Sequence, residues 1–378
     1  MNAIPEPLIA SREVQLWVGP QHPGVPGNMA MQIWVEGDTI NRGITHVGYL
    51  HRAFEKLIER RTFYQAFPVV CRICVPEPDT NEYLLATAVE ELAGISGDVP
   101  PRAQWIRTLV LEMSRLAALL MVVGGQAGGM GLGAAPQWMI ALRDYVLDLF
   151  EELSGGRIYH MYIIYGGVRR DLPEGFAARV EAVLKRIEER LPMVDNLIFE
   201  SAVFRKRAMG VGVVPKEWAE ETTLSGPVVR AMGIPRDVRK DYPYLVYPEL
   251  DFDVVTTEGS DIYARALVRR LEIDQAIDLI RQILARMPKG GPVLGKAGNP
   301  LRWQVPAGQT YVRAEATRGE YGYFIATDGS DKIRRFHVRG PSYVHGVSLL
   351  ERILPGLNIS DLYPLMNSLQ VCPPEIER

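Results

Sequence analysis

The spacing of apolar residues divides the chain into three parts. Residues 12–45 alternate apolar and polar side chains in "EVQLWVGP" and "MAMQIWVEGDTINRG", which is typical of short strands, with "EGDT" as a hairpin turn. Residues 46–300 follow the helical period, most clearly in "PEGFAARVEAVLKRIEERLPMVDNLIF" and "SDIYARALVRRLEIDQAIDLIRQILARM". Residues 301–378 return to strand and turn patterning and end in a short helix and a proline-rich tail.

These patterns predict an α+β fold: a mainly helical bundle core with a small β hairpin region at 1–45, and a β segment with a C-terminal tail at 301–378. We expect a single domain over residues 1–378, because the chain shows no internal repeat, low-complexity linker or clear boundary. No charged residue occurs between Arg115 and Arg143, but the centre "GGQAGGMGLGAAP" is too rich in glycine for a lipid-facing helix. We expect a helix, a tight glycine segment and a second helix there, buried inside the protein.

Composition narrows the classes of function. Lys and Arg total 42 against 45 Asp and Glu, so the net charge gives no indication of broad nucleic-acid or lipid binding. Three cysteines in 378 residues do not make a disulfide framework, and "MNAIPEPLIASREV" lacks the charged and apolar regions of a secretory signal. We therefore expect a cytoplasmic protein that works at a membrane only through partners.

The cysteines carry the clearest candidate chemistry. Cys71 and Cys74 have CxxC spacing, but a structural zinc site needs four ligands, and the only other cysteine is Cys372. A second pattern competes: "CVPE" begins at Cys74 and "CPPE" begins at Cys372, so that each thiol is followed three residues later by a carboxylate, Glu77 or Glu375. If the two ends of the chain fold together, both pairs face one cavity. The alternative is buried thiols that behave as small apolar side chains.

The residues after Cys74 predict its ionisation. "DTNE" fits a capping box, with Asp79 as the N-cap and Glu82 at N3 of the next helix. Cys74 then lies just before a helix N-terminus, and both the helix dipole and the neighbouring Arg72 favour a thiolate.

Several segments of the chain, in consistent order, resemble one known superfamily. They are "GPQHP" (19–23), "GYLHRAFEKL" (48–57), "GGVRRDLP" (166–173), "SGPVVRAMGIPRDVRKDYPY" (225–244), "EATRGEYGYFIATDGS" (315–330) and "HVRGPSYVHG" (337–346). Together they resemble the quinone-site (D-type) subunit of NADH-quinone oxidoreductase, the respiratory complex I, and its relative, the large subunit of membrane-bound nickel-iron hydrogenases. The resemblance implies a fold like the hydrogenase large subunit.

The hydrogenase resemblance implies a dismantled metal site. The family holds its nickel-iron centre with two pairs of cysteines, and here Cys74 and Glu77 stand at one pair and Cys372 and Glu375 at the other. Two thiolates and two carboxylates are a poor substitute for four soft ligands, so we expect no metal at this site and no hydrogenase activity.

The quinone resemblance is also partial. In the family, a Tyr in an RxDY pattern and a His in an HPxxHG pattern contact the quinone headgroup. In this chain Val75 stands at the position of the Tyr and Pro26 at the position of the His.

The pattern that remains resembles the large subunit of the archaeal-type membrane-bound sulfane sulfur reductase. The implied activity is reduction of polysulfide or a related sulfane sulfur with electrons from ferredoxin, coupled to ion translocation. The implied partners, lettered as in NADH-quinone oxidoreductase, are a small B-like iron–sulfur protein that holds the proximal [4Fe–4S] cluster, a ferredoxin-like cluster subunit, a C-like protein, and membrane subunits that are H-like and antiporter-like. This chain itself would bind no cofactor and would lie at the cytoplasmic face of the cell membrane.

The implied mechanism places Cys74 and Cys372 at the old metal site, where a thiolate attacks the polysulfide, Glu77 or Glu375 delivers protons and Arg72 attracts the anion. The alternative is a vestigial pocket with inert thiols. Two other functions also stay open: a quinone-linked dehydrogenase subunit of the NADH-quinone type, and a structural subunit that only anchors the cluster-bearing partner.

Four further residues are candidates for the pocket or a proton path, each beside a structural alternative. His22 either faces the cavity or bonds the backbone of its turn. Glu55, predicted to lie four residues after His51 in one helix, corresponds to a glutamate of the family's proton path or forms a surface ion pair. Arg339 and His345 close the set, although an arginine at a strand end often only bonds carbonyl oxygens.

Overall fold

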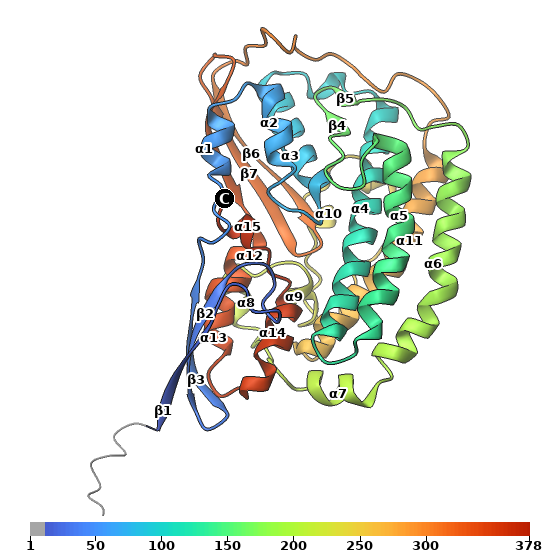
Figure 1. The fold of residues 1–378 in the computed structure, drawn as a ribbon. Coiled ribbons are helices and arrows are strands. Elements are labelled where there is room, and N and C mark those ends of the chain that lie inside the picture. The colour runs from blue at the N-terminus through green and yellow to red at the C-terminus, as the bar shows by residue number, and fades with distance from the viewer. Residues whose placement is uncertain (1–11) are drawn as a thin grey trace, which may run out of the picture.

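A small antiparallel sheet opens the fold in the computed structural model, which describes residues 12–378; the first eleven residues of the predicted 1–45 β region lie outside it. The sheet comprises β1 (Glu13–Val18), β2 (Ala30–Glu36) and β3 (Thr39–His46) in that order, and it projects from the body of the protein (Figure 1). Gly37 takes a φ of 63° between β2 and β3, which confirms the hairpin turn predicted at "EGDT".

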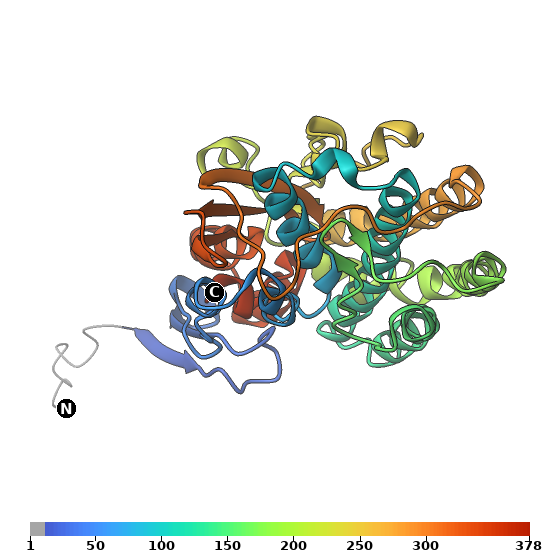
Figure 2. The ribbon, with the colours of Figure 1, turned by 90° about the horizontal axis from the view of Figure 1, so that it is seen from above.

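Five long helices form the core. They are α3 (Pro78–Leu92), α4 (Pro101–Gly128), α5 (Ala134–Ser154), α6 (Phe176–Ile198) and α11 (Ile262–Arg286). Helix α4 packs between α5 and α11, and α6 lies on the outside of α5 (Figures 1 and 2). The predicted α+β fold with a mainly helical core is confirmed.

The uncharged glycine-rich stretch forms the end of α4, a tight turn and the start of α5, as the sequence predicts. The predicted burial of the whole stretch is wrong, because Gly129, Gly131 and Gly133 in the turn are exposed. A Cβ atom at Gly128 would lie 2.4 Å from the Pro136 side chain, so the two helices approach too closely for any other residue at 128. Within the described part of the chain no helix is long and apolar enough to cross a membrane.

Shorter elements connect the core. They are α1 (Phe54–Glu59), α2 (Phe63–Val70), α7 (Ala202–Ala208), α8 (Trp218–Glu221), α9 (Pro227–Arg230), α10 (Val238–Asp241), the two-residue strands β4 (Ile163–Ile164) and β5 (Gly167–Val168), and the 3₁₀ helices η2 (Ser96–Asp98) and η3 (Tyr247–Glu249). Ala53 has a φ of 53°, a left-handed backbone conformation that interrupts the helical geometry before α1. The helix predicted to contain both His51 and Glu55 therefore begins only after His51.

A second antiparallel sheet packs against α3 and comprises β6 (Gly308–Ala316), β7 (Gly319–Thr327) and β8 (Ile333–Arg339). Two residues, Thr317 and Arg318, form the tip of the β6–β7 hairpin. Gly319 begins β7 with a φ of 137°, and a Cβ atom there would lie 2.4 Å from Ser225 Oγ, so the tip is held tightly against the loop before α9.

The C-terminal segment folds back against the region around residues 50–60. It consists of α12 (Pro341–Tyr343), the π-helix η4 (Val344–Leu349), α13 (Leu350–Ile353), the 3₁₀ helix η5 (Ile359–Asp361), α14 (Leu362–Leu369) and α15 (Pro373–Ile376). The chain end lies beside α1, and His51 Nδ1 contacts the backbone carbonyl of Glu377 (Figure 1).

The predicted capping box at "DTNE" is wrong. Helix α3 begins at Pro78, one residue before Asp79, and Glu77 occupies the N-cap position. Asp79 instead binds the His160 ring, with Nδ1 2.9 Å from Oδ1, and Glu82 accepts hydrogen bonds from the backbone N–H groups of residues 161–163. These tertiary partners outcompete the local cap.

Candidate functional site

The two cysteine–glutamate segments meet beneath the tip of the β6–β7 hairpin. Cys74 lies in the turn between α2 and α3, and Cys372 is the N-cap residue of α15. The two Sγ atoms and a carboxylate oxygen of Glu375 all lie within 4.8 Å of one another. All of these side chains are buried, and the three cysteines are free thiols.

Arg318 stands between the two segments. Its Nη1 atom lies 3.0 Å from Cys74 Sγ and donates to Glu77 Oε2 over 3.0 Å, and it lies 4.0 Å from Glu375 Oε2. The side chain is only 3% exposed, so its charge acts in a medium of low dielectric constant. One cation therefore serves one thiol and two carboxylates.

The two glutamates differ in their environment. Glu77 accepts from the Thr317 N–H and hydroxyl as well as from Arg318, which fills both of its oxygens. Glu375 accepts at Oε1 from the Ser342 N–H over 2.8 Å, while Oε2 is buried without a hydrogen-bond partner among the described residues. Burial raises the pKa of Glu375 to about 8, so this carboxyl group is suited to hold a proton near neutral pH.

The two thiols also differ, and in the opposite sense to the sequence prediction. A hydrogen bond from Cys74, aided by Arg318 and the start of α15, lowers the pKa of Cys372 to about 6. Burial raises the pKa of Cys74, which therefore keeps its proton and donates it toward Cys372. The thiolate predicted at Cys74 is favoured at Cys372 instead, chiefly because Cys74 donates a hydrogen bond to the Cys372 sulfur.

Arg72 does not take part in this cluster, contrary to expectation. It donates to the Pro68 carbonyl over 2.6 Å, lies 3.3 Å from Cys71 Sγ, and stacks over the Tyr159 ring. Cys71 is fully buried, and burial raises its pKa to about 12, so this thiol has little nucleophilic character. Arg318 has the electrostatic role that we had assigned to Arg72.

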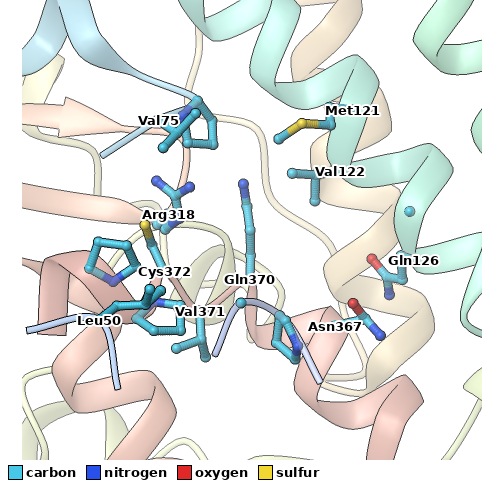
Figure 3. A pocket seen from close by; sticks show the side chains of 16 residues that line it. Leu50, Val75, Met121, Val122, Gln126, Arg318, Asn367, Gln370, Val371 and Cys372 are labelled. Atoms are coloured by element: carbon cyan, nitrogen blue, oxygen red, sulfur yellow. The ribbon is translucent and has the colours of Figure 1, made fainter. Parts of the chain in front are cut away.

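A cavity of about 400 Å³ opens beside Cys372 and Arg318. Its walls are mainly apolar, and Figure 3 shows Met121 and Val122 facing Arg318 across it, with the Gln370 side chain between them. The residues that line it are Pro26, Gly27, Leu50, Val75, Pro76, Met121, Val122, Gly125, Gln126, Arg318, Asn367, Gln370, Val371, Cys372, Pro373 and Pro374. Pro26 and Val75, the replacements for the quinone partners of the resembling family, thus both face this cavity.

The other candidates lie elsewhere. His22 is exposed, accepts from the Gly24 N–H at Nδ1 and stacks on Tyr363, outside the cavity lining. Glu55 contacts Arg335, His337 and Arg378 in a partly exposed ion-pair cluster.

Arg339 donates to the carbonyls of Glu320 and Thr223, the structural role that its strand-end position also allows. His345 is fully buried in η4 and neither ring nitrogen has a partner among the described residues.

The cluster does not fit a nickel-iron centre. Both oxygens of Glu77 are occupied by Thr317 and Arg318, which leaves two thiols and one carboxylate as free donors. The guanidinium 3.0 Å from Cys74 Sγ adds a positive charge where a metal ion would stand. A soft thiolate set is what such a centre requires, and these residues do not supply it.

Arg318 is the candidate site residue that the sequence alone did not indicate. "EATRGEYG" marks the hairpin, since Gly319 follows a strand and allows its tight turn. Which cavity the tip enters depends on the packing of β6–β7 against α3, and no local pattern encodes that packing.

Comparison with known proteins gives consistent matches along the chain. The family described as "Respiratory-chain NADH dehydrogenase, 49 Kd subunit" matches residues 130–303 and 300–378. The D subunit of NADH-quinone oxidoreductase from Thermosipho melanesiensis is 44% identical over 369 residues, which is 97% of this chain and 100% of that protein. The D subunit of F(420)H(2) dehydrogenase from Methanosarcina mazei is 36% identical over 378 residues, 99% of this chain and 100% of that protein.

A solved structure matches equally well. One chain of the membrane-bound sulfane sulfur reductase, described as an archaeal respiratory membrane complex, superposes with a TM-score of 0.93 and is 42% identical. The match covers 97% of this chain and 98% of that chain.

Proposed function

Because the chain belongs to the family of the 49 kDa subunit of respiratory-chain NADH dehydrogenase, we propose that it forms the site where a respiratory complex reduces polysulfide or related sulfane sulfur. At the coarser level, the chain is an oxidoreductase subunit of a complex I-like respiratory assembly. The finer assignment is supported by the likeness to the sulfane sulfur reductase chain and, above all, by one observation: two buried thiols lie together with Arg318 beside an apolar cavity.

The first step is attack by the Cys372 thiolate on a sulfur atom of the polysulfide. The new bond joins Cys372 Sγ to that sulfur, the adjacent S–S bond breaks, and the shortened polysulfide leaves with the electron pair. Arg318 lines the cavity next to Cys372 and attracts the anionic chain, while the apolar walls accept its uncharged sulfur atoms. The product on the protein is a Cys372 persulfide.

Cys74 resolves this persulfide. Its sulfur attacks Cys372 Sγ, HS⁻ leaves with the electron pair, and a Cys74–Cys372 disulfide forms. Two electrons, delivered one at a time by an iron–sulfur cluster of a partner protein, then reduce the disulfide, and one proton restores the resting state, with Cys74 as a thiol and Cys372 as a thiolate. Glu375 is the proton donor and acceptor, because one of its carboxylate oxygens lies within 4.8 Å of both thiols and its Oε2 has no hydrogen-bond partner among the described residues.

The setting follows from the same proposal. The chain itself would hold no metal, and its partners would be a small B-like iron–sulfur protein with the proximal [4Fe–4S] cluster, a ferredoxin-like cluster subunit, a C-like protein and ion-translocating membrane subunits that are H-like and antiporter-like. The chain would lie at the cytoplasmic face of the membrane, held by these partners.

Analysis of the purified complex tests this function. We expect iron without nickel, and release of sulfide that requires polysulfide and a reduced ferredoxin-type donor. Nickel in stoichiometric amount, or a complex that consumes no polysulfide under reducing conditions, would be incompatible with the proposal.

Quinone reduction is the second candidate, favoured by the apolar lining of the cavity. Its support is limited by Pro26 and Val75, neither of which offers a hydrogen bond to a quinone oxygen. Reduction of a quinone with NADH by the complex, at a rate that exceeds its polysulfide-dependent rate, would favour this candidate. A purely structural role would instead leave sulfide release unchanged when both thiols are replaced.

A further inference from the structure

Two arginines inside the protein have no acidic partner within the described part of the chain. Arg265 and Arg269 lie four residues apart on one face of α11, and both are fully buried. Within residues 12–378, every hydrogen-bond acceptor of the two guanidinium groups is neutral. Arg265 donates to Ser368 Oγ and to the carbonyls of Gly212 and Ser260, and Arg269 donates to Gln370 Oε1 and to the carbonyl of Arg265.

Among the residues that the structure describes, polar atoms of three buried side chains also lack hydrogen-bond partners. The Nη2 atom of each arginine is buried without a hydrogen-bond partner among residues 12–378, and so are both ring nitrogens of His345. Helix α11 carries the two arginines and η4 carries His345. Both elements contact the same neighbour, helix α14. A π-helical turn such as η4 is uncommon and is frequently found at functional sites.

The local electrostatic field is positive. The charged groups that act on His345 are Arg265 and Arg269 on α11, Arg339 on β8 and Arg318 at the hairpin tip; burial together with these cations lowers the pKa of His345 to about 3. Burial and the repulsion from Arg265 and Arg318 likewise lower the pKa of Arg269 to about 9, despite the opposing charge of Glu272. Both arginines still carry their charge at neutral pH.

Buried charges in proteins are normally paired, because an isolated ion loses its hydration without compensation. A water molecule could satisfy the free N–H groups but would not neutralise the two charges. A small anion would accept from the free N–H groups and would also offset one of the two charges. Among the described residues no carboxylate is within ion-pair distance to do so, which leaves a ligand from outside the chain.

We propose that Arg265 and Arg269 bind one small monovalent anion through their Nη2 atoms, next to the His345 ring. Chloride from the medium and hydrosulfide released by the proposed reaction share this chemistry. Only the hydrosulfide source rests on the proposed function, and the site itself does not. Gln370 connects the site to the cysteine cluster, because it accepts from Arg269 Nε and donates to Thr317 Oγ1 over 3.4 Å.

Hydrogen–deuterium exchange of the intact complex tests this site. Exchange of peptides from α11 and η4 is compared in chloride, in hydrosulfide under anaerobic conditions, and in gluconate, which is too large to enter, at equal ionic strength. An anion that binds only the closed state slows exchange by about tenfold when its concentration is ten times its dissociation constant. Protection by both small anions, or by one of them, supports the site and identifies the source. Equal exchange in all three solutions overturns it.

A charge-supplying variant separates an anion from a water molecule. His345→Asp places a carboxylate beside the arginines, so protection should become independent of chloride and hydrosulfide. The matched variant His345→Asn is neutral and should keep the dependence. Anion-dependent protection that persists in His345→Asp would contradict the proposal. Arg269→Gln, which removes one of the two charges, should weaken the dependence and provides a second check if either histidine variant fails to fold.

Discussion

Thr317 holds both oxygens of the Glu77 carboxylate, donating from its backbone N–H to Oε1 and from its hydroxyl to Oε2, each over 2.7 Å. Arg318 is a third donor to this carboxylate, so Glu77 is held in place by three hydrogen bonds. Its role is therefore to position Arg318. Glu375 has one oxygen without a hydrogen-bond partner among residues 12–378 and is the better candidate for moving protons, and this difference shapes the expected effects of substitution.

The rate of sulfide release, plotted against pH, should give a bell-shaped curve. Cys372 must be a thiolate to attack, and its lowered pKa of about 6 makes the rate fall as the pH drops through that value. Glu375 must carry a proton to donate, and its raised pKa of about 8 makes the rate fall as the pH rises through that value. Glu375→Gln should abolish the alkaline limb and reduce the rate by roughly 10²–10⁴-fold. A flat profile between these two values and beyond would contradict the assignment.

Substitution of the thiols should separate the three cysteines. Cys372→Ser removes the nucleophile and Cys74→Ser removes the resolving thiol, and each should reduce polysulfide-dependent sulfide release by roughly 10³-fold or more. Cys71→Ser is the matched control, since Cys71 is buried three residues before Cys74 with its thiol turned toward Pro68. The measurement is turnover of the intact complex with all three variants at equal subunit content. Normal turnover in both Cys74→Ser and Cys372→Ser would remove the thiol mechanism.

Arg318→Met should raise the pKa of the Cys372 thiol, because it removes the cation that stabilises the thiolate. The rate of alkylation of Cys372 by iodoacetamide can be measured as a function of pH by mass spectrometry of the peptide that contains it. In Arg318→Met this rate should reach half of its maximum at a pH above the value of about 6 expected for the wild type. Arg318→Lys, which keeps the charge, is the control and should shift the midpoint less. The methionine variant also leaves the Glu77 carboxylate buried without its cation, which should lower the free energy of unfolding by about 3–5 kcal/mol. An unchanged alkylation profile would show that Arg318 does not act on the thiol.

The glycines of α4 provide a test of the packing that supports the cavity wall. Gly128→Ala should destabilise the α4–α5 contact by about 1–3 kcal/mol, since the new Cβ atom would lie 2.4 Å from Pro136. Gly125→Ala, one turn earlier on the same helix, has no heavy atom within 4 Å of its new Cβ and should be neutral or slightly stabilising. Exchange protection of peptides from Ala134–Ser154 measures the difference. Similar protection in the two variants would argue against the close approach.

The sequence allowed the long elements to be predicted because their patterns are local. The helix at Phe176–Ile198 shows an apolar residue every three to four positions, and the β2–β3 hairpin carries its turn glycine in place. The repeated cysteine, proline and glutamate pattern likewise indicated which two segments to compare. The resemblance to the 49 kDa family is confirmed along the chain.

What could not be predicted depends on contacts between distant residues. Asp79 and Glu82 look like a helix cap, but His160 and the loop at 161–163 take their oxygens. Arg72 is adjacent to the cysteine segment in sequence, yet its side chain turns back to the Pro68 carbonyl. Arg318 is more than 240 residues from Cys74 and reaches it only because a hairpin tip is wedged against the loop before α9.

The meeting of Cys74 with Cys372 has a consequence for synthesis of the protein. The two halves of the site are about 300 residues apart, and the second half is translated after every helix of the core. A chain that ends before Cys372 therefore contains every long helix of the core but lacks Cys372 and Glu375. Partner proteins that contact both segments would find only one half of the site on such a chain.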